Sequence, residues 1–229
     1  MSDSDAYITL VSSLPASERL FVAKKPPLSR VRLERRLTLL SAEDRETLAQ
    51  IESIMSWGAY SMNDTEADVL ARVRAVMAGL KRKTLRTIVA ERMDLRTTIA
   101  ALRMRRRGDG PPTALLGASR LVPHIIANWS DPAFHLQRRL PWLREAVTLL
   151  EKDDPLALER HLLDTTFRQL KRHAARHSFD FEAVVIYVLK WSIFDRWADR
   201  DTRAAERRFE TLTQQALKGF DGLVLEGAL

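Results

Sequence analysis

Residues 181–197, FEAVVIYVLKWSIFDRW, are the most apolar helical stretch of the chain. Its apolar and aromatic side chains would surround most of a helix: Val184, Val185, Tyr187, Val188, Leu189, Trp191 and Trp197. A helix at a protein surface has a single apolar stripe, whereas a helix that is apolar on most sides is contacted from several directions. The stretch therefore predicts a helix that packs against several neighbours.

The composition favours helices on both sides of this stretch. The 229 residues include 33 Leu, 29 Arg and 27 Ala, which are good helix formers, and only 8 Gly and 9 Pro. The lack of cysteine excludes a disulfide framework, a thiolate zinc site and a cysteine nucleophile, and it favours an intracellular location. We expect no secretory signal, because the opening Met-Ser-Asp-Ser-Asp lacks the basic and apolar regions of one. We expect no membrane span, because no uncharged apolar run approaches about 18 residues.

Several turn and capping signals predict where the helices begin and end. A helical pattern follows Pro26-Pro27, and Ser41-Ala42-Glu43-Asp44 reads as a capping box that opens the next helix. Two further helices are expected after residues 63–65 and up to Gly108. Asp131-Pro132 and Asp154-Pro155 each offer an N-cap followed by proline, so helices are predicted from about residues 132, 155, 181 and 200.

These signals predict an all-α fold, a multi-helical funnel or wedge-like helical bundle with about two related helical subdomains. The break at Gly108-Asp109-Gly110-Pro111-Pro112 divides an N-terminal wedge, residues 1–108, from a C-terminal wedge, residues 109–229, and the two wedges could pack as one domain. Tyr7-Ile8-Thr9-Leu10-Val11 is the only convincing strand-like run. It predicts a short N-terminal extended segment.

Positive charge is concentrated in one region. The formal net charge is +7, and residues 71–110 alone hold twelve basic and three acidic side chains, which leaves the rest of the chain slightly acidic. The cluster Arg103, Arg105, Arg106 and Arg107 closes a predicted helix, where the helix dipole favours cations. Nucleic-acid binding is the alternative explanation, although no aromatic residue lies between Tyr60 and Trp129 to stack a base.

No catalytic, cofactor-binding or metal-binding set emerges from the motifs. His173 and His177 have the i, i+4 spacing of paired zinc ligands, but the glutamate of a metalloprotease helix is missing between them, so a solvated basic helix face is favoured. No glycine-rich phosphate loop occurs. Asp195, Asp199 and Asp201 alternate with Arg196, Arg200 and Arg203, which indicates an ion-paired helix surface.

Three segments resemble a known family. Residues 179–197, together with residues 92–103, RMDLRTTIAALR, resemble the C-type subunit of the V/A-type rotary ATPases, which is the d-type subunit of eukaryotic enzymes. The opening YITLVSSLP, residues 7–15, resembles small bacterial proteins related to this C-type subunit. The positions that carry the resemblance are Asp94, Ile99, Glu182, Tyr187, Lys190, Asp195 and Arg196. Thr98 stands where the family usually has Asn.

The resemblance implies a non-catalytic central-stalk subunit of an ion-translocating, proton-transporting ATPase. It would link the rotor stalk to the membrane ring and transmit torque, with other ATPase subunits as partners and peripheral contact with the cytoplasmic membrane face. Arg103, Arg105, Arg106 and Arg107 would face the ring or lipid headgroups. Neither a cofactor, a small-molecule substrate nor a nucleic acid is expected. The alternatives are a soluble basic nucleic-acid-binding or regulatory adaptor and, third, an enzyme of unknown type.

Overall fold

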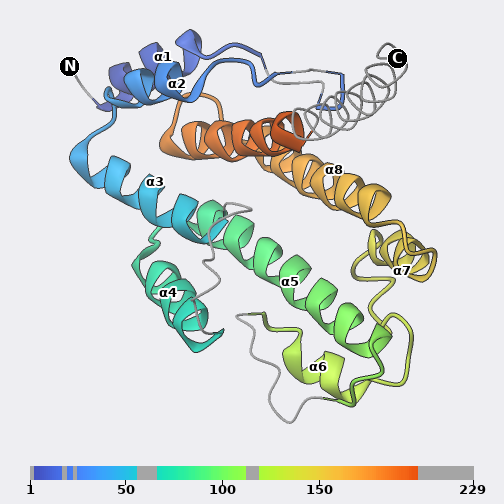
Figure 1. Cartoon of the computed structure of the whole chain (residues 1–229). Coiled ribbons are helices and arrows are strands. Elements are labelled where there is room, and N and C mark those ends of the chain that lie inside the picture. Colours follow the sequence, from blue (N-terminus) through green and yellow to red (C-terminus); the bar gives the residue numbers. More distant parts are fainter. Residues whose placement is uncertain (1–2, 17–19, 23–24, 56–65, 112–118, 201–229) are drawn as a thin grey trace, which may run out of the picture.

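The computed structural model describes residues 3–16, 20–22, 25–55, 66–111 and 119–200. Within these ranges the regular structure is helical and includes no strand, which confirms the predicted all-α, multi-helical bundle. The helices are α1 (Asp3–Ser13), α2 (Arg30–Leu37), α3 (Ala42–Met55), α4 (Glu66–Gly79), α5 (Lys83–Arg106), α6 (Val122–Ala127), α7 (Leu143–Glu151) and α8 (Pro155–Ala174). A further helix occupies residues 181–200 and is drawn in orange to red in Figure 1.

The long helix α5 organises the molecule. It contacts α3, α6, α7 and α8, and α7 packs against α8. Figure 1 shows α1 and α2 lying over the helix of residues 181–200, whereas the C-terminal end of α5 lies at the opposite end of the molecule, close to α6 and α7. None of the described helices is both long enough and apolar enough to cross a membrane.

Buried apolar side chains form two clusters. The larger cluster combines residues from α1 to the first half of α5 with the second half of α8 and the helix of residues 181–200. The smaller cluster combines the second half of α5 with α6, α7 and the first half of α8. Because α5 and α8 contribute to both clusters, these two helices hold them together. The division of the chain at Gly108 stays a prediction.

The helix of residues 181–200 is contacted on several sides, as its sequence predicts. Val184, Val185 and Val188 are fully buried. On another side, the Trp191 indole N–H donates a hydrogen bond to the Leu28 carbonyl oxygen at 2.7 Å. Partly buried Trp197 also packs edge-to-face against Phe21, with the ring centroids 5.0 Å apart.

The predicted N-terminal extended segment is wrong. Residues 7–11 lie within α1, where the Thr9 hydroxyl donates to the Asp5 carbonyl oxygen one turn earlier, and Leu10 is fully buried. A strand needs a neighbouring strand to satisfy its backbone groups, whereas a helix satisfies them internally. With no strand among the described residues, the helix is the conformation that meets this requirement.

The two Asp-Pro signals have different outcomes. Asp154 caps α8, because its carboxylate accepts from the Ala157 N–H at 2.8 Å. The predicted cap at Ser41 is also present, since its hydroxyl oxygen accepts from the Asp44 N–H of α3 at 3.1 Å. The helix predicted from about residue 132 is wrong, since residues 132–135 form turns and the next helix after α6 is α7. The helix predicted from about residue 200 lies outside the described residues.

Asp131 explains why no helix starts beside it. One oxygen of its carboxylate accepts from the N–H groups of both Ala133 and His135 at 2.8 Å. Phe134 and His135 then adopt a φ of 54°, in the left-handed region, which places the Phe134 side chain fully inside the smaller cluster. A side chain that binds two amides in this way offers the backbone an alternative to the helix.

This turn predicts a pH-dependent contribution to stability. The hydrogen bonds from His135 and Ala133 lower the pKa of Asp131 below its ordinary value of 3.8, with burial opposing them. The stabilisation is therefore complete above the ordinary pKa and is lost as the pH falls through the lowered one. We expect Asp131→Ala to cost about 1–2 kcal/mol at neutral pH and clearly less at pH about 2, because both N–H groups lose their acceptor. Urea denaturation at the two pH values measures the difference, and an equal cost at both would contradict the explanation.

Candidate functional site

The predicted arginine cluster lies at the C-terminal end of α5. Gly108, with a φ of +85°, ends the helix there, and the Asp109 N–H bonds back to the Met104 carbonyl oxygen. Arg106 pairs with Asp153 at 2.9 Å and Arg107 pairs with Asp109 at 2.8 Å, so part of the charge is neutralised locally.

The other two arginines of the cluster differ in their contacts. Arg105 donates to the Ser130 carbonyl oxygen at 3.3 Å. Arg103 is exposed and has no ion-pair partner among the residues that the structure describes. A cavity of about 480 Å³ beside the cluster is lined by Arg103, Arg106 and Arg107 and by leucines of α7 and α8. The lining also includes Asp153 and Asp154, so the end of α5 combines guanidinium groups with both leucines and carboxylates.

A larger cavity, of about 930 Å³, lies between α5, α7 and α8. A smaller cavity of about 320 Å³ shares Thr87, Asp94 and Arg120 with it and continues along α5. We call the two together the basic groove. Its cationic side chains come from four parts of the chain: Lys83, Arg86, Arg120, Arg139, Arg168, Lys171 and Arg172. Its acidic side chains are Glu91, Asp94 and Glu145.

Two of the acidic side chains in the groove already have partners. Glu91 lies 3.1 Å from His173 Nε2, and Asp94 accepts from the Ser119 hydroxyl at 2.5 Å. These contacts hold the two carboxylates in place, and the groove still has seven cationic side chains against three acidic ones.

The groove was not predicted from the sequence, because the charge pattern placed the basic surplus in residues 71–110 alone. Five of the seven cations, Arg120, Arg139, Arg168, Lys171 and Arg172, lie outside that region. One signal was available, since Arg168, Lys171 and Arg172 are spaced i, i+3, i+4 and so share a face of α8. Nothing in the sequence indicated that this face meets α5.

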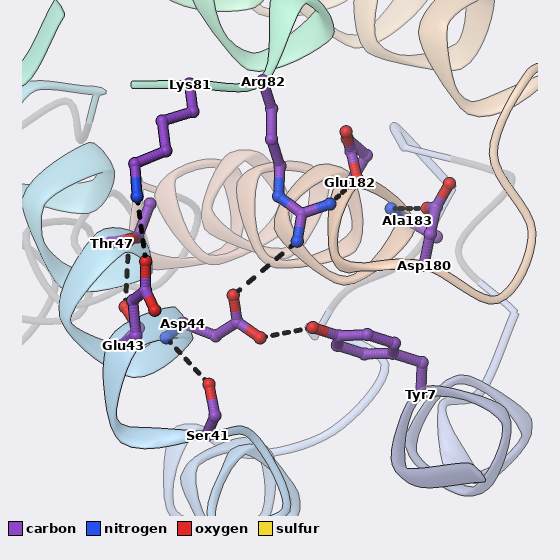
Figure 2. Close-up of polar contacts among 10 residues, drawn as sticks. All are labelled: Tyr7, Ser41, Glu43, Asp44, Thr47, Lys81, Arg82, Asp180, Glu182 and Ala183. Carbon is purple, nitrogen blue, oxygen red and sulfur yellow. Dashed lines mark hydrogen bonds and ion pairs between the residues drawn. The ribbon is translucent and has the colours of Figure 1, made fainter. Parts of the chain in front are cut away.

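A third polar arrangement centres on Arg82, which directly precedes α5 (Figure 2). Its guanidinium lies 2.9 Å from Glu182 and 4.0 Å from Asp44, and it stacks over the Phe181 ring at 5.1 Å. Asp44 in turn accepts a hydrogen bond from the Tyr7 hydroxyl. Arg82 thus connects α1, α3, α5 and the helix of residues 181–200. We call this arrangement the Arg82 clamp.

The two predicted histidine candidates are not on a solvated face, so that prediction is wrong. Their side chains are each only 14% exposed. His173 faces Glu91 of α5, whereas His177 lies beyond the end of α8, with Nε2 at 3.0 Å from the Thr84 hydroxyl and Nδ1 at 2.6 Å from Asp180. Because α8 ends at Ala174 and the chain then turns, the two histidines do not share a helix face.

His177, Asp180 and Glu182 place potential metal-ligating atoms within 4.8 Å of one another. All three side chains already have structural partners, and those of His177 are Thr84 and Asp180. Glu182 pairs with Arg82, and Asp180 accepts from the Ala183 N–H at 2.8 Å as the cap of its helix. The cluster is therefore accounted for as part of the contacts that surround the Arg82 clamp.

Several of the positions that carry the family resemblance lie in contacts between helices. Ile99 is buried in the smaller cluster, and Lys190 is 7% exposed with its ammonium 5.3 Å from the Phe167 ring centroid. Arg196 pairs with Glu159 of α8 at 2.9 Å, and Arg200 pairs with the same carboxylate. Two of the predicted arginines, Arg196 and Arg200, therefore pair with a carboxylate of another helix. Asp201 and Arg203 lie outside the described residues.

Two of these positions have shifted acidities. Burial raises the pKa of Tyr187 to about 12, and its hydroxyl has no hydrogen-bond partner among the residues that the structure describes. Partial burial and the neighbouring Asp199 raise the pKa of Asp195, while Arg30 opposes the change. These shifts have structural causes, and neither residue lines the basic groove.

Comparison with known proteins identifies a family. Residues 73–220 match the family described as "Protein of unknown function (DUF2764)". No curated protein and no solved structure matches the chain. The matched residues cover most of the chain, including α5, α8 and the helix of residues 181–200. The chain therefore belongs to the DUF2764 family.

Proposed function

We propose that this protein is a short relative of the C-type subunit of V/A-type rotary ATPases and acts as a coupling part between the central stalk and the membrane ring. The proposal rests first on the resemblance of residues 92–103 and 179–197 to that family. Both segments contribute buried side chains to the core, the first within α5 and the second mainly in the helix of residues 181–200.

The observation that carries the proposal is where the polar side chains of these segments lie. Glu182 contacts Arg82, a hundred residues earlier in the chain, and Arg196 contacts Glu159 of α8. Asp94 similarly binds Ser119, beyond the end of α5. Polar positions of the resemblance thus tie distant helices together. A close-packed body with such ties deforms little under load, which suits a part that transmits torque.

The end of α5 is the surface that we propose faces the membrane ring or the lipid headgroups. Arg103 and Arg107 are exposed there, at the end of the molecule away from α1 and α2 (Figure 1). Guanidinium groups bind phosphates and carboxylates through paired hydrogen bonds, so this end suits polar ring loops and anionic headgroups alike.

Affinity purification tests the proposal directly. A tagged copy, expressed in its native host and extracted from membranes in mild detergent, is expected to co-purify with the ATPase catalytic and ring subunits. Absence of all these subunits from a stable, folded preparation would contradict the proposed function.

Charge reversal tests the proposed surface. We expect Arg103→Glu with Arg107→Glu to lower the recovery of ATPase subunits about tenfold, which corresponds to about 1.4 kcal/mol of lost binding free energy. The fold should persist, because only the exposed Arg107–Asp109 pair is broken. Circular dichroism checks the helix content of the variant.

The matched control makes the same change of charge at the other end of the molecule. Arg32 and Arg35 of α2 are exposed, so Arg32→Glu with Arg35→Glu should leave the recovery unchanged. An equal loss in both variants would mean that net charge, and not the end of α5, governs assembly.

A further inference from the structure

We infer that the basic groove binds an acidic segment of a partner protein. The proposal is independent of the rotary-ATPase function, since it concerns a different surface from the end of α5. It rests on three features of the groove: its shape, its uncompensated cations and the mixed chemistry of its walls.

The shape suits an extended or helical peptide. The larger cavity alone has a volume of about 930 Å³, and the smaller cavity lengthens it along α5 as far as Lys83 and Arg86. The walls come from α5, α7 and α8 and from the turns that precede α6 and α7. The packed helices α5 and α8 carry five of the seven cations, so the backbone at those positions needs little reordering when a ligand binds.

The cations of the groove are exposed, and most have no charged partner. Arg168 pairs with Asp164, one turn earlier on α8, and Lys171 also has an interaction partner. Five cations remain that have no ion pair with any residue the structure describes: Lys83, Arg86, Arg120, Arg139 and Arg172. Like charges gathered in one concave surface raise the local concentration of anions and favour a ligand of opposite charge.

The walls favour a peptide over a nucleic acid. Glu91, Asp94 and Glu145 would repel a phosphate backbone, which carries a negative charge at every nucleotide. A peptide also carries backbone N–H donors, which a phosphate backbone lacks, and these can donate to the acidic side chains and to the polar side chains of Thr165 and Gln169.

The groove also has apolar lining. Leu140, Pro141 and Trp142, in the turn before α7, line the larger cavity together with the largely buried Leu95 of α5. These side chains would contact an apolar side chain of the ligand, and an apolar anchor beside charged groups is a common arrangement in protein interfaces. The expected ligand therefore carries several carboxylates and at least one apolar residue.

Fluorescence anisotropy with a defined probe tests the inference. The probe is a short fluorescein-labelled peptide in which Glu alternates with Ala and which ends in Leu, and it is titrated with the full-length protein at low ionic strength. We expect saturable binding that weakens as salt is added. Arg120→Glu with Arg172→Glu should weaken this binding about tenfold, because each change replaces a charge-assisted contact by repulsion.

A second pair of substitutions separates the groove from the general surface charge. Arg138 and Arg144 are exposed, close to the groove in sequence and absent from its lining. Arg138→Glu with Arg144→Glu makes the same change in net charge and should leave the affinity for the probe almost unchanged. Equal weakening by both pairs would overturn the inference.

Competition with other polyanions decides the class of ligand. We expect the acidic peptide to be displaced less effectively by oligothymidylate or inorganic polyphosphate than by an unlabelled copy of itself. Tighter binding of either phosphate polymer, lost in Arg120→Glu with Arg172→Glu, would overturn the peptide and identify a phosphate-binding groove instead. No binding of the probe at low salt would overturn the groove as an anion site.

Discussion

Trp191→Ala is expected to lower the free energy of unfolding by about 4 kcal/mol, the range observed when a buried tryptophan is truncated. Trp191 is only 4% exposed, and its indole N–H donates to the Leu28 carbonyl oxygen at 2.7 Å. The Arg30 guanidinium also lies 5.6 Å from the ring centroid. The substitution would therefore leave a cavity and an unpaired carbonyl oxygen between the helix of residues 181–200 and the start of α2.

Urea denaturation followed by far-UV circular dichroism measures this loss. Trp191→Phe serves as the partner variant, because it keeps most of the apolar contact and removes only the indole N–H. We expect it to cost about 1–2 kcal/mol, the cost of one buried acceptor left unpaired. If the Ala variant does not fold, the Phe variant still gives a measurable value. A cost below about 0.5 kcal/mol for either variant, the usual effect of a surface substitution, would contradict the packing of α2 on this helix.

Arg82→Ala is expected to cost about 2 kcal/mol, the second-largest effect that we predict. The side chains of its partners are mostly covered, with Glu182 12% and Asp44 14% exposed. Removing the guanidinium leaves these two carboxylates without their cation, and an unpaired buried charge is costly. The cost stays below that of a fully buried pair, because Arg82 itself is 42% exposed and partly screened by water.

The adjacent residue supplies the control for the Arg82 clamp. Lys81 pairs with Glu43 at 3.6 Å, but both side chains are more than 80% exposed. Lys81→Ala is therefore expected to change the free energy of unfolding by no more than about 0.5 kcal/mol. Adding Glu182→Gln to Arg82→Ala should recover part of the loss, since it removes one unpaired charge. Equal effects of Arg82→Ala and Lys81→Ala would mean that the clamp does not stabilise the fold.

The clamp also bears on the proposed function. Glu182 is one of the positions that carry the resemblance to the rotary-ATPase family, and through Arg82 it joins the last described helix to α3. A variant that folds but lacks this tie should show faster amide hydrogen exchange at α1 and α3, the elements that the clamp holds. Such a result would support a structural role for the resemblance positions within a rigid coupling body.

Much of the helical architecture could be predicted from residues that act over one or two turns. Ser41 and Asp154 signal helix starts because their side chains bond to N–H groups only three residues away. The apolar spacing of α5 likewise predicts its buried face, since Leu85, Ile88, Val89, Leu95, Ile99 and Leu102 are all buried. The same local reasoning was wrong for residues 7–11 and for Asp131. For residues 7–11, no partner strand occurs in the part of the chain that the structure describes. At Asp131, a competing turn decided the conformation.

By itself, the sequence determined that the fold is helical, where several of the described helices begin, and that an arginine cluster closes α5. Only the tertiary structure decided which charges meet. It brought Arg120, Arg139 and Arg172 to the same groove as Arg86, and it placed Arg82 against Glu182, a hundred residues away. The physical reason is the distance along the chain over which each feature is decided. Capping and periodicity depend on neighbours within a few residues. A groove depends on the angles at which whole helices cross, and the packing of both buried clusters sets those angles.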